Sequence, residues 1–116
     1  MDIIKQYWVD DFVKSADFYL PKYNILIFVD GTYYHCFPEH KLYKYPCYYN
    51  EMKHMFSYDI WQRDKWVTEE CIRQGFVVVR IWEHDVMNEE DNGVSFNKCI
   101  NKIEKAIKVS FYSQAT

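Results

Sequence analysis

The most apolar stretch of the chain is residues 24–29, in which an unbroken run from Ile25 to Val29 precedes Asp30-Gly31. A short run without polar interruptions is typical of a strand that is buried on both faces. Pro-Lys-Tyr-Asn at residues 21–24 favours a turn before it. Residues 3–20 are rich in β-branched and aromatic side chains and predict one or two further strands. Two strands joined by this turn would form an antiparallel hairpin that ends at Asp30-Gly31.

Residues 57–74 show the clearest helical pattern. Ile60, Val67 and Cys71 recur at the spacing of one helix face. Ser57 is expected to cap the helix, and Gly75 is expected to end it.

Two more elements follow this helix. Residues 76–82 (FVVVRIW) predict a buried strand entered through Gly75. Residues 95–109 predict an amphipathic helix with its apolar positions on one face: Phe96, Ile100, Ile103 and Ile107. Residues 36–53 read as a long irregular loop. Helix-to-strand crossovers predict an α/β fold, with a mixed sheet that contains an antiparallel hairpin and is flanked by helices.

Size and composition limit the class of protein. A chain of 116 residues with 49% hydrophobic and 20% aromatic residues predicts one globular domain. The longest apolar run is too short to span a bilayer, so no membrane partner is expected. The formal charge of −3 disfavours a strongly basic nucleic-acid-binding surface. It does not exclude a nuclease, because active-site carboxylates cancel the positive charge that phosphate contacts require.

The cysteines leave three interpretations open. Cys36, Cys47, Cys71 and Cys99 could form two disulfides, contribute to a metal site, or remain reduced. No Cys-x-x-Cys pair is present, and Cys71 lies on the apolar side of the predicted helix. Reduced structural thiols in a cytoplasmic protein are therefore the favoured interpretation.

Charged side chains interrupt the apolar pattern at three places. Asp17 lies inside a predicted strand, Asp30 ends the central strand, and Asp64 falls on the apolar face of the helix. A carboxylate on a core-facing position is costly unless it is paired, hydrogen-bonded or bound to a metal. The hairpin places Asp17 beside Asp30, and His35 follows closely. Clustered oxygen ligands with one histidine suit Mg²⁺ or Mn²⁺ better than zinc.

Each residue also has a purely structural interpretation. Asp30-Gly31 could form an ordinary turn, Asp64 could pair with a lysine or arginine at the edge of the core, and His35 could be a hydrogen-bonded structural histidine. The combination, rather than any one residue, favours a site.

Two stretches, ADFYLPKYNILIFVDGTYYH and WQRDKWVTEECIRQGFVVVRIWEHDV, resemble the very-short-patch-repair (Vsr) endonucleases. These enzymes belong to the PD-(D/E)XK superfamily, which also includes phage homing endonucleases of the EDxHD type. The resemblance covers residues 16–86 and implies a restriction-endonuclease-like fold.

The resemblance assigns roles by position. Asp17 matches the metal-binding aspartate, and Val29 stands where the backbone carbonyl of a threonine contacts the metal. Asp30 replaces a histidine, so it would add a metal ligand or alter the metal preference. His35 matches the histidine taken to assist proton transfer, and Asp64 matches the helix aspartate.

Two departures from the family matter. The structural zinc of the patch-repair enzymes is not expected, because the matching positions include Thr32, Phe37 and His84. Cys36, His40 and Cys47 could form a different zinc site, which leaves that alternative open. The family also has an upstream helix with a catalytic glutamate. Residues 1–16 read as strand instead, so we expect residues 1–116 to be the nuclease domain of a longer chain with an N-terminal DNA-binding part.

The resemblance therefore implies a Mg²⁺-dependent DNA endonuclease, either homing or repair-like, that acts on double-stranded DNA without a small-molecule cofactor. The tyrosine-rich segment 36–58 is expected to contact DNA through four side chains: Lys41, Lys44, Tyr45 and Lys53. It could instead be a flap packed on the core. Two interpretations are open for Glu83, His84 and Asp85. They could border the cleft that binds DNA, or they could simply be polar residues that follow the strand of residues 76–82. The alternative function is a catalytically inactive nuclease-fold module that binds nucleic acid.

Overall fold

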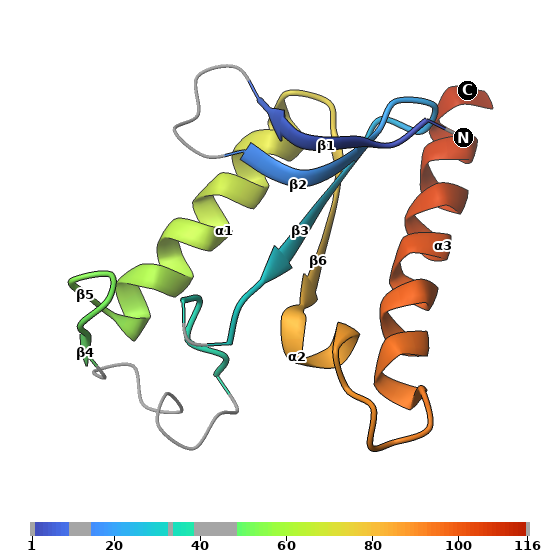
Figure 1. Cartoon of the computed structure of the whole chain (residues 1–116). Coiled ribbons are helices and arrows are strands. Elements are labelled where there is room, and N and C mark those ends of the chain that lie inside the picture. Colours follow the sequence, from blue (N-terminus) through green and yellow to red (C-terminus); the bar gives the residue numbers. More distant parts are fainter. Residues whose placement is uncertain (1, 10–14, 33, 39–48, 116) are drawn as a thin grey trace.

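The computed structural model describes residues 2–9, 15–32, 34–38 and 49–115. A four-stranded sheet has the order β1-β2-β3-β6 and is formed by β1 (Ile4–Trp8), β2 (Ser15–Leu20), β3 (Ile25–Asp30) and β6 (Val77–Trp82). The first three strands are antiparallel, and β6 runs parallel to β3. Helices α1 (Ser57–Arg73) and α3 (Val94–Ala115) flank the sheet on opposite sides (Figure 1). The predicted mixed α/β fold with an antiparallel hairpin is confirmed.

The hairpin β2–β3 turns as its residues predict. Tyr23 N donates to the carbonyl of Leu20 at 3.1 Å, and Asn24 adopts a positive φ of 54°. The Asn24 side chain accepts a hydrogen bond from the Tyr19 hydroxyl at 2.8 Å and donates one to the carbonyl of Gly75 at 2.8 Å. The turn is thereby tied to the end of α1, which helps to align β3 with β6.

Strand β3 is buried on both faces, as predicted. Ile25 and Ile27 belong to the core cluster under α3, whereas Leu26 and Phe28 belong to the cluster on the side of α1. Successive side chains of a strand point to opposite faces, so one short strand contributes to both cores.

Helix α1 differs from the prediction at its beginning but not at its end. Ser57 is the first helical residue, and Phe56 takes the cap position without a side-chain hydrogen bond, so the expected Ser57 cap is wrong. At the other end, Gly75 has φ +100°. Gly75 N donates to the carbonyl of Ile72 at 2.9 Å and Phe76 N to that of Cys71 at 3.1 Å. This is a Schellman motif, in which glycine avoids the steric cost of a left-handed conformation.

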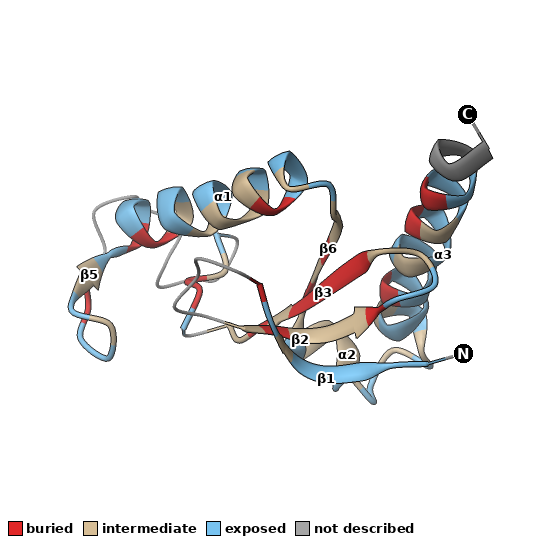
Figure 2. Ribbon diagram, turned by 90° about the horizontal axis from the view of Figure 1, so that it is seen from above, coloured by how far each residue is buried: buried red, intermediate tan, exposed pale blue. Residues whose placement is uncertain are grey.

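Helix α3 packs on the sheet through part of the predicted face, since Ile103 and Ile107 contact the core cluster. Cys99, Ala106 and Ser110 are buried, whereas Phe96 and Ile100 are 44% and 37% exposed. Figure 2 shows this alternation of buried and exposed turns along α3. Small side chains at Cys99 and Ala106 allow the helix to approach the sheet closely, and Phe96 and Ile100 lie at the margin of the contact.

Residues within and beyond the expected loop form three short elements. Strands β4 (Tyr49–Asn50) and β5 (Met55–Phe56) form a separate small hairpin at the beginning of α1, and α2 (Glu83–Val86) follows β6. In the described part of the chain, no helix has the length and apolar character needed to cross a lipid bilayer.

Cys36, Cys71 and Cys99 are buried in the structure, and Cys71 and Cys99 form no disulfide. Burial raises the pKa of each of these thiols. They therefore remain protonated at neutral pH, as expected of structural thiols. Cys47 lies outside the described residues.

Candidate functional site

A polar cluster lies where β3 and β6 end side by side between the sheet and α1. Asp30 is the last residue of β3 and pairs in register with Trp82, the last residue of β6. The cluster contains Asp30, His35, Asp64 and Arg80. Three of these four residues were predicted to form a site from the sequence.

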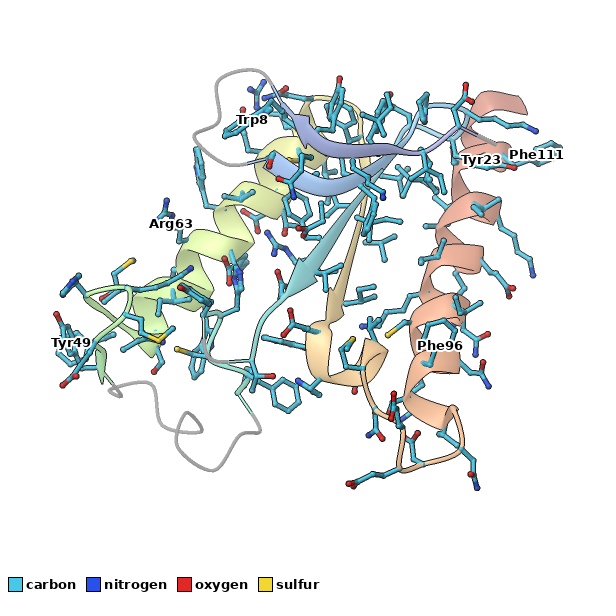
Figure 3. The ribbon with its side chains drawn as sticks, in the orientation of Figure 1. Trp8, Tyr23, Tyr49, Arg63, Phe96 and Phe111 are labelled. Atoms are coloured by element: carbon cyan, nitrogen blue, oxygen red, sulfur yellow. The ribbon has the colours of Figure 1, made fainter. Side chains whose placement is uncertain are left out.

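His35 and Asp64 form its central pair. His35 follows β3 in a tight turn, in which its backbone N donates to the carbonyl of Gly31 at 3.0 Å. Nδ1 of the ring lies 2.7 Å from Oδ2 of Asp64, and both side chains are largely buried. Figure 3 shows Arg63 pointing away from the sheet, while its neighbour Asp64 reaches His35. The helix thus directs the carboxylate inward, as its place on the face of Ile60 predicted.

Asp30 lies on the other side of the imidazole. Its Oδ1 is 3.7 Å from Nε2 of His35 and accepts a hydrogen bond from Nη1 of Arg80 at 2.8 Å. Burial raises the pKa of Asp30 above its ordinary value, and the positive charge of Arg80 opposes this rise. An ion pair with few water contacts therefore lies directly beside His35.

Asp17 is not part of this cluster and is hydrogen-bonded to the neighbouring strand of the hairpin. Its Oδ2 accepts a hydrogen bond from Val29 N at 2.7 Å. The register of β1 with β2 is interrupted at Gln6, opposite Asp17, where Gln6 has φ 55°. A non-glycine residue in this conformation carries steric strain, and such strain is concentrated at functional sites.

A surface pocket of about 470 Å³ opens at this interruption. Its lining comes from β1, β2, β3, α2 and the residue after α2: Lys5, Gln6, Asp17, Phe18, Val29, Glu83, Val86 and Met87. Phe18, Val29 and Val86 belong to the core cluster under α3. The predicted site residues are therefore divided between the two faces of the sheet. Asp17 and Val29 border the pocket on one face, and Asp30, His35 and Asp64 lie on the other.

The pocket contains donors of the type that Mg²⁺ prefers. The Asp17 carboxylate, the Val29 backbone and Glu83 supply hard oxygen atoms, and Lys5 and Met87 line the same pocket. Within residues 2–9, 15–32, 34–38 and 49–115, no three His, Cys, Asp or Glu residues are grouped as ligands of one metal. Asp30 does not line this pocket, and its carboxylate is paired with Arg80.

Thr32, Phe37 and His84, the three positions at which the sequence resemblance led us to expect no zinc, lie together. Oγ1 of Thr32 is 2.7 Å from Nδ1 of His84, and the ring of Phe37 contacts that of His84 at a centroid distance of 4.5 Å. Trp82 stacks near the same histidine, at 5.9 Å. A hydrogen bond and aromatic contacts join the loop after β3 to the end of β6.

The expected DNA-contacting residues are mostly outside the described part of the chain. Lys41, Lys44 and Tyr45 fall in residues 39–48, as do His40 and Cys47 of the alternative zinc site. Lys53 lies in the turn between β4 and β5, where its backbone N donates to Oδ1 of Asn50 at 3.1 Å.

Arg80 was missed by sequence reasoning, although a signal was present. It is the charged residue within FVVVRIW, and alternation along β6 places it on the face opposite Val79 and Ile81. The reasoning that singled out Asp64, a charge within an apolar pattern, applies equally to Arg80.

Comparisons with known proteins add no assignment. No family model matches the chain, and no curated protein or solved structure matches it either.

Proposed function

We propose that this chain is the catalytic domain of a metal-dependent DNA endonuclease that hydrolyses phosphodiester bonds, in a homing or repair-like role. The observation that carries the proposal is the pair of His35 and Asp64, 2.7 Å apart at the end of β3. The Asp17 carboxylate accepts a hydrogen bond from Val29 N and borders a pocket that lies across the sheet from this pair. The resemblance to the patch-repair endonucleases supports the same assignment.

The histidine is oriented for proton transfer. An ionised carboxylate only accepts hydrogen bonds, so Asp64 requires the proton of His35 to be on Nδ1. Nε2 is then the basic nitrogen, and it can take a proton from an attacking water or return one to the leaving oxygen. The pair therefore performs general acid–base catalysis, with Asp64 fixing the tautomer of His35.

The pocket would hold the metal. A magnesium ion bound by the Asp17 carboxylate and the Val29 carbonyl would polarise the scissile phosphate and acidify a bound water. Mn²⁺ suits the same oxygen donors. Asp17 also accepts the Val29 N–H, which holds its carboxylate beside the Val29 backbone. We do not assign Asp30 as a metal ligand, because its carboxylate is bonded to Arg80.

We propose double-stranded DNA as the substrate and the cytoplasm as the compartment. The buried thiols of Cys71 and Cys99 form no disulfide, which suits a reducing environment.

A second candidate is an inactive nuclease-fold module that binds nucleic acid. Two observations favour it. The described residues contain no group of three His, Cys, Asp or Glu residues placed to hold a metal, and Asp17 and Asp30 both bond to protein groups. A binding module would keep the fold without needing a metal at the pocket.

Nicking of supercoiled plasmid separates the two. The nuclease proposal expects relaxed circles with Mg²⁺, none with EDTA, and recovery when Mg²⁺ is added in excess. Binding to the plasmid without nicking under either condition would favour the inactive module.

A further inference from the structure

Arg80 is held by more contacts than an ordinary surface arginine. Nη1 bonds the Asp30 carboxylate at 2.8 Å, and Nε donates to Oγ1 of Thr68 at 2.6 Å. Nη2 lies 3.4 Å from the backbone carbonyl of Asp64. The guanidinium also lies over the ring of Phe28, 4.4 Å from its centroid. These contacts join β3, β6 and α1 around one side chain that is 21% exposed.

The contacts of Arg80 lie on both sides of His35. Asp64, on α1, bonds Nδ1 of the imidazole, and Asp30, on β3, faces Nε2. Arg80, on β6, bonds the carboxylate of Asp30 and the backbone of Asp64. One cation thus controls the placement of both acidic neighbours of the histidine.

We propose that Arg80 is a positioning residue for His35: it holds the Asp30 carboxylate away from Nε2, so that Nε2 is not bonded to a carboxylate while Nδ1 remains bonded to Asp64. This inference rests on the proposed nuclease function. It gives Asp30 a structural role and assigns a function to Arg80.

The distances explain why Arg80 is needed. At 3.7 Å, Oδ1 of Asp30 is beyond hydrogen-bond distance of Nε2. A buried carboxylate that lost its arginine would be left with an unsatisfied charge. The nearest donor in this cluster is the ring of His35. Its two nitrogens would then both be bonded to carboxylates, and neither could exchange a proton with water.

Arg80→Met tests this step, because methionine keeps the apolar contact with Phe28 and removes the charge. We expect kcat for plasmid nicking to fall about 10- to 100-fold, short of the loss from removing an acid–base group outright, with KM unchanged. Arg73→Met is the matched control, since Arg73 pairs with Glu70 on the exposed side of α1. It should leave kcat and KM at wild-type values. Wild-type kcat in Arg80→Met would overturn the proposal.

The double variant Asp30→Asn/Arg80→Met tests whether the effect passes through Asp30. Removing the carboxylate together with its cation leaves nothing to capture Nε2, so kcat should recover most of the loss seen in Arg80→Met. A double variant as slow as Arg80→Met, or slower, would overturn the proposal, because Arg80 or Asp30 would then act by another route.

A spectroscopic measurement does not depend on cleavage. The ring ¹⁵N resonances of His35 should show a shifted Nε2 signal in Arg80→Met, and this signal should return toward its wild-type position in the double variant. Nδ1 should keep its wild-type resonance in both. An unchanged Nε2 resonance in Arg80→Met would contradict the positioning role. If the wild type fails to nick DNA, the proposed function fails, but this shift still decides the role of Arg80.

Arg80→Lys keeps the test decisive if Arg80→Met does not fold. Lysine retains a cation for Asp30 but cannot bond Thr68 and the Asp64 carbonyl together with it. We expect its Nε2 resonance near the wild-type position and its kcat close to the wild-type value. If the Nε2 resonance of Arg80→Lys is shifted from the wild-type position, and the double variant Asp30→Asn/Arg80→Met shows the same shift, the effect does not pass through Asp30. That result would overturn the proposal.

Discussion

At the scale of single residues, the pair of His35 and Asp64 and the carboxylate of Asp17 have different local roles. The imidazole is bonded on one nitrogen by an acidic partner, and we propose the other nitrogen for proton transfer. Asp17 bonds the backbone of the neighbouring strand and borders the pocket. Substitutions of Asp17 and of His35 should therefore have different effects on nicking.

Asp17→Asn should abolish nicking and leave the fold unchanged. The amide oxygen of asparagine can still accept the hydrogen bond from Val29 N, but the negative charge that a metal requires is gone. Plasmid nicking and far-UV circular dichroism measure the two parts of this expectation. Asp59→Asn, an exposed aspartate in the first turn of α1, is the control and should nick normally. Nicking by Asp17→Asn near the wild-type rate, with unchanged Mg²⁺ dependence, would remove Asp17 from the site.

His35→Asn should slow nicking by about two to four orders of magnitude, the usual contribution of one acid–base group. Asparagine is close in size to the inner part of the imidazole and can still bond Asp64, so the cluster should remain folded. His54→Asn is the matched control, because His54 is exposed in the turn before β5 and has φ 54°, a conformation that asparagine tolerates. A small rate change in His35→Asn with an unaltered pH–rate profile would mean that His35 is only structural.

At the scale of elements, the connection from α1 to β6 fixes how the helix presents Asp64. The Schellman motif at Gly75 ends α1, and the Asn24 side chain bonds the carbonyl of Gly75. These contacts at the C-terminal end of α1 therefore fix the position and direction of the helix relative to the sheet.

Gly75→Ala should lower the free energy of unfolding by about 1–2 kcal/mol, the cost of a left-handed conformation for a residue with a Cβ. An added Cβ at Gly75 would meet nothing within 4 Å, so the effect is conformational rather than steric. Chemical denaturation measures it.

Gly31→Ala provides the comparison for that experiment. Gly31 has no positive φ, and a Cβ there would touch Tyr34 at 3.9 Å, an ordinary contact. Its free energy of unfolding should change by less than about 0.5 kcal/mol. Equal effects of the two substitutions would contradict the conformational explanation.

The elements differ in how far the sequence determines them. The hairpin and the C-terminal stop of α1 depend on local turn residues such as Asn24 and Gly75, and both were predicted. The buried face of α3 depends on how closely the helix approaches the sheet. Hydrophobicity favoured Phe96 and Ile100, but Cys99 and Ala106 pack inward because they are small.

The candidate site was predicted in part for a similar reason. Charges within apolar patterns revealed Asp17, Asp30 and Asp64, because such residues are costly without partners. The sequence does not show which partner each one finds. Arg80 binds Asp30 from a strand fifty positions away along the chain. The separation of Asp17 from His35 by the sheet likewise follows from the register and could not be read from spacing.

At the scale of the whole molecule, the formal charge of −3 provides little general attraction to DNA. We expect these 116 residues to bind duplex DNA weakly and with little sequence preference, with Kd roughly 10⁻⁴–10⁻⁶ M at physiological salt. Affinity should fall steeply as salt rises, because phosphate contacts dominate such binding. Fluorescence anisotropy with a labelled duplex at several salt concentrations measures both quantities. Nanomolar, sequence-selective binding would show that this chain reads the target itself.

We propose that a metal-binding carboxylate, Asp17, and the His35–Asp64 pair act together to cleave DNA from opposite faces of the sheet at the same end of β3. The most direct test is nicking of supercoiled plasmid by purified wild-type protein and Asp17→Asn, prepared in parallel, with Mg²⁺ and with EDTA. The account predicts nicking by the wild type with Mg²⁺ alone, and none by the variant or in EDTA. Absence of nicking by the wild type with Mg²⁺ or Mn²⁺, or equal nicking by the variant, would contradict it.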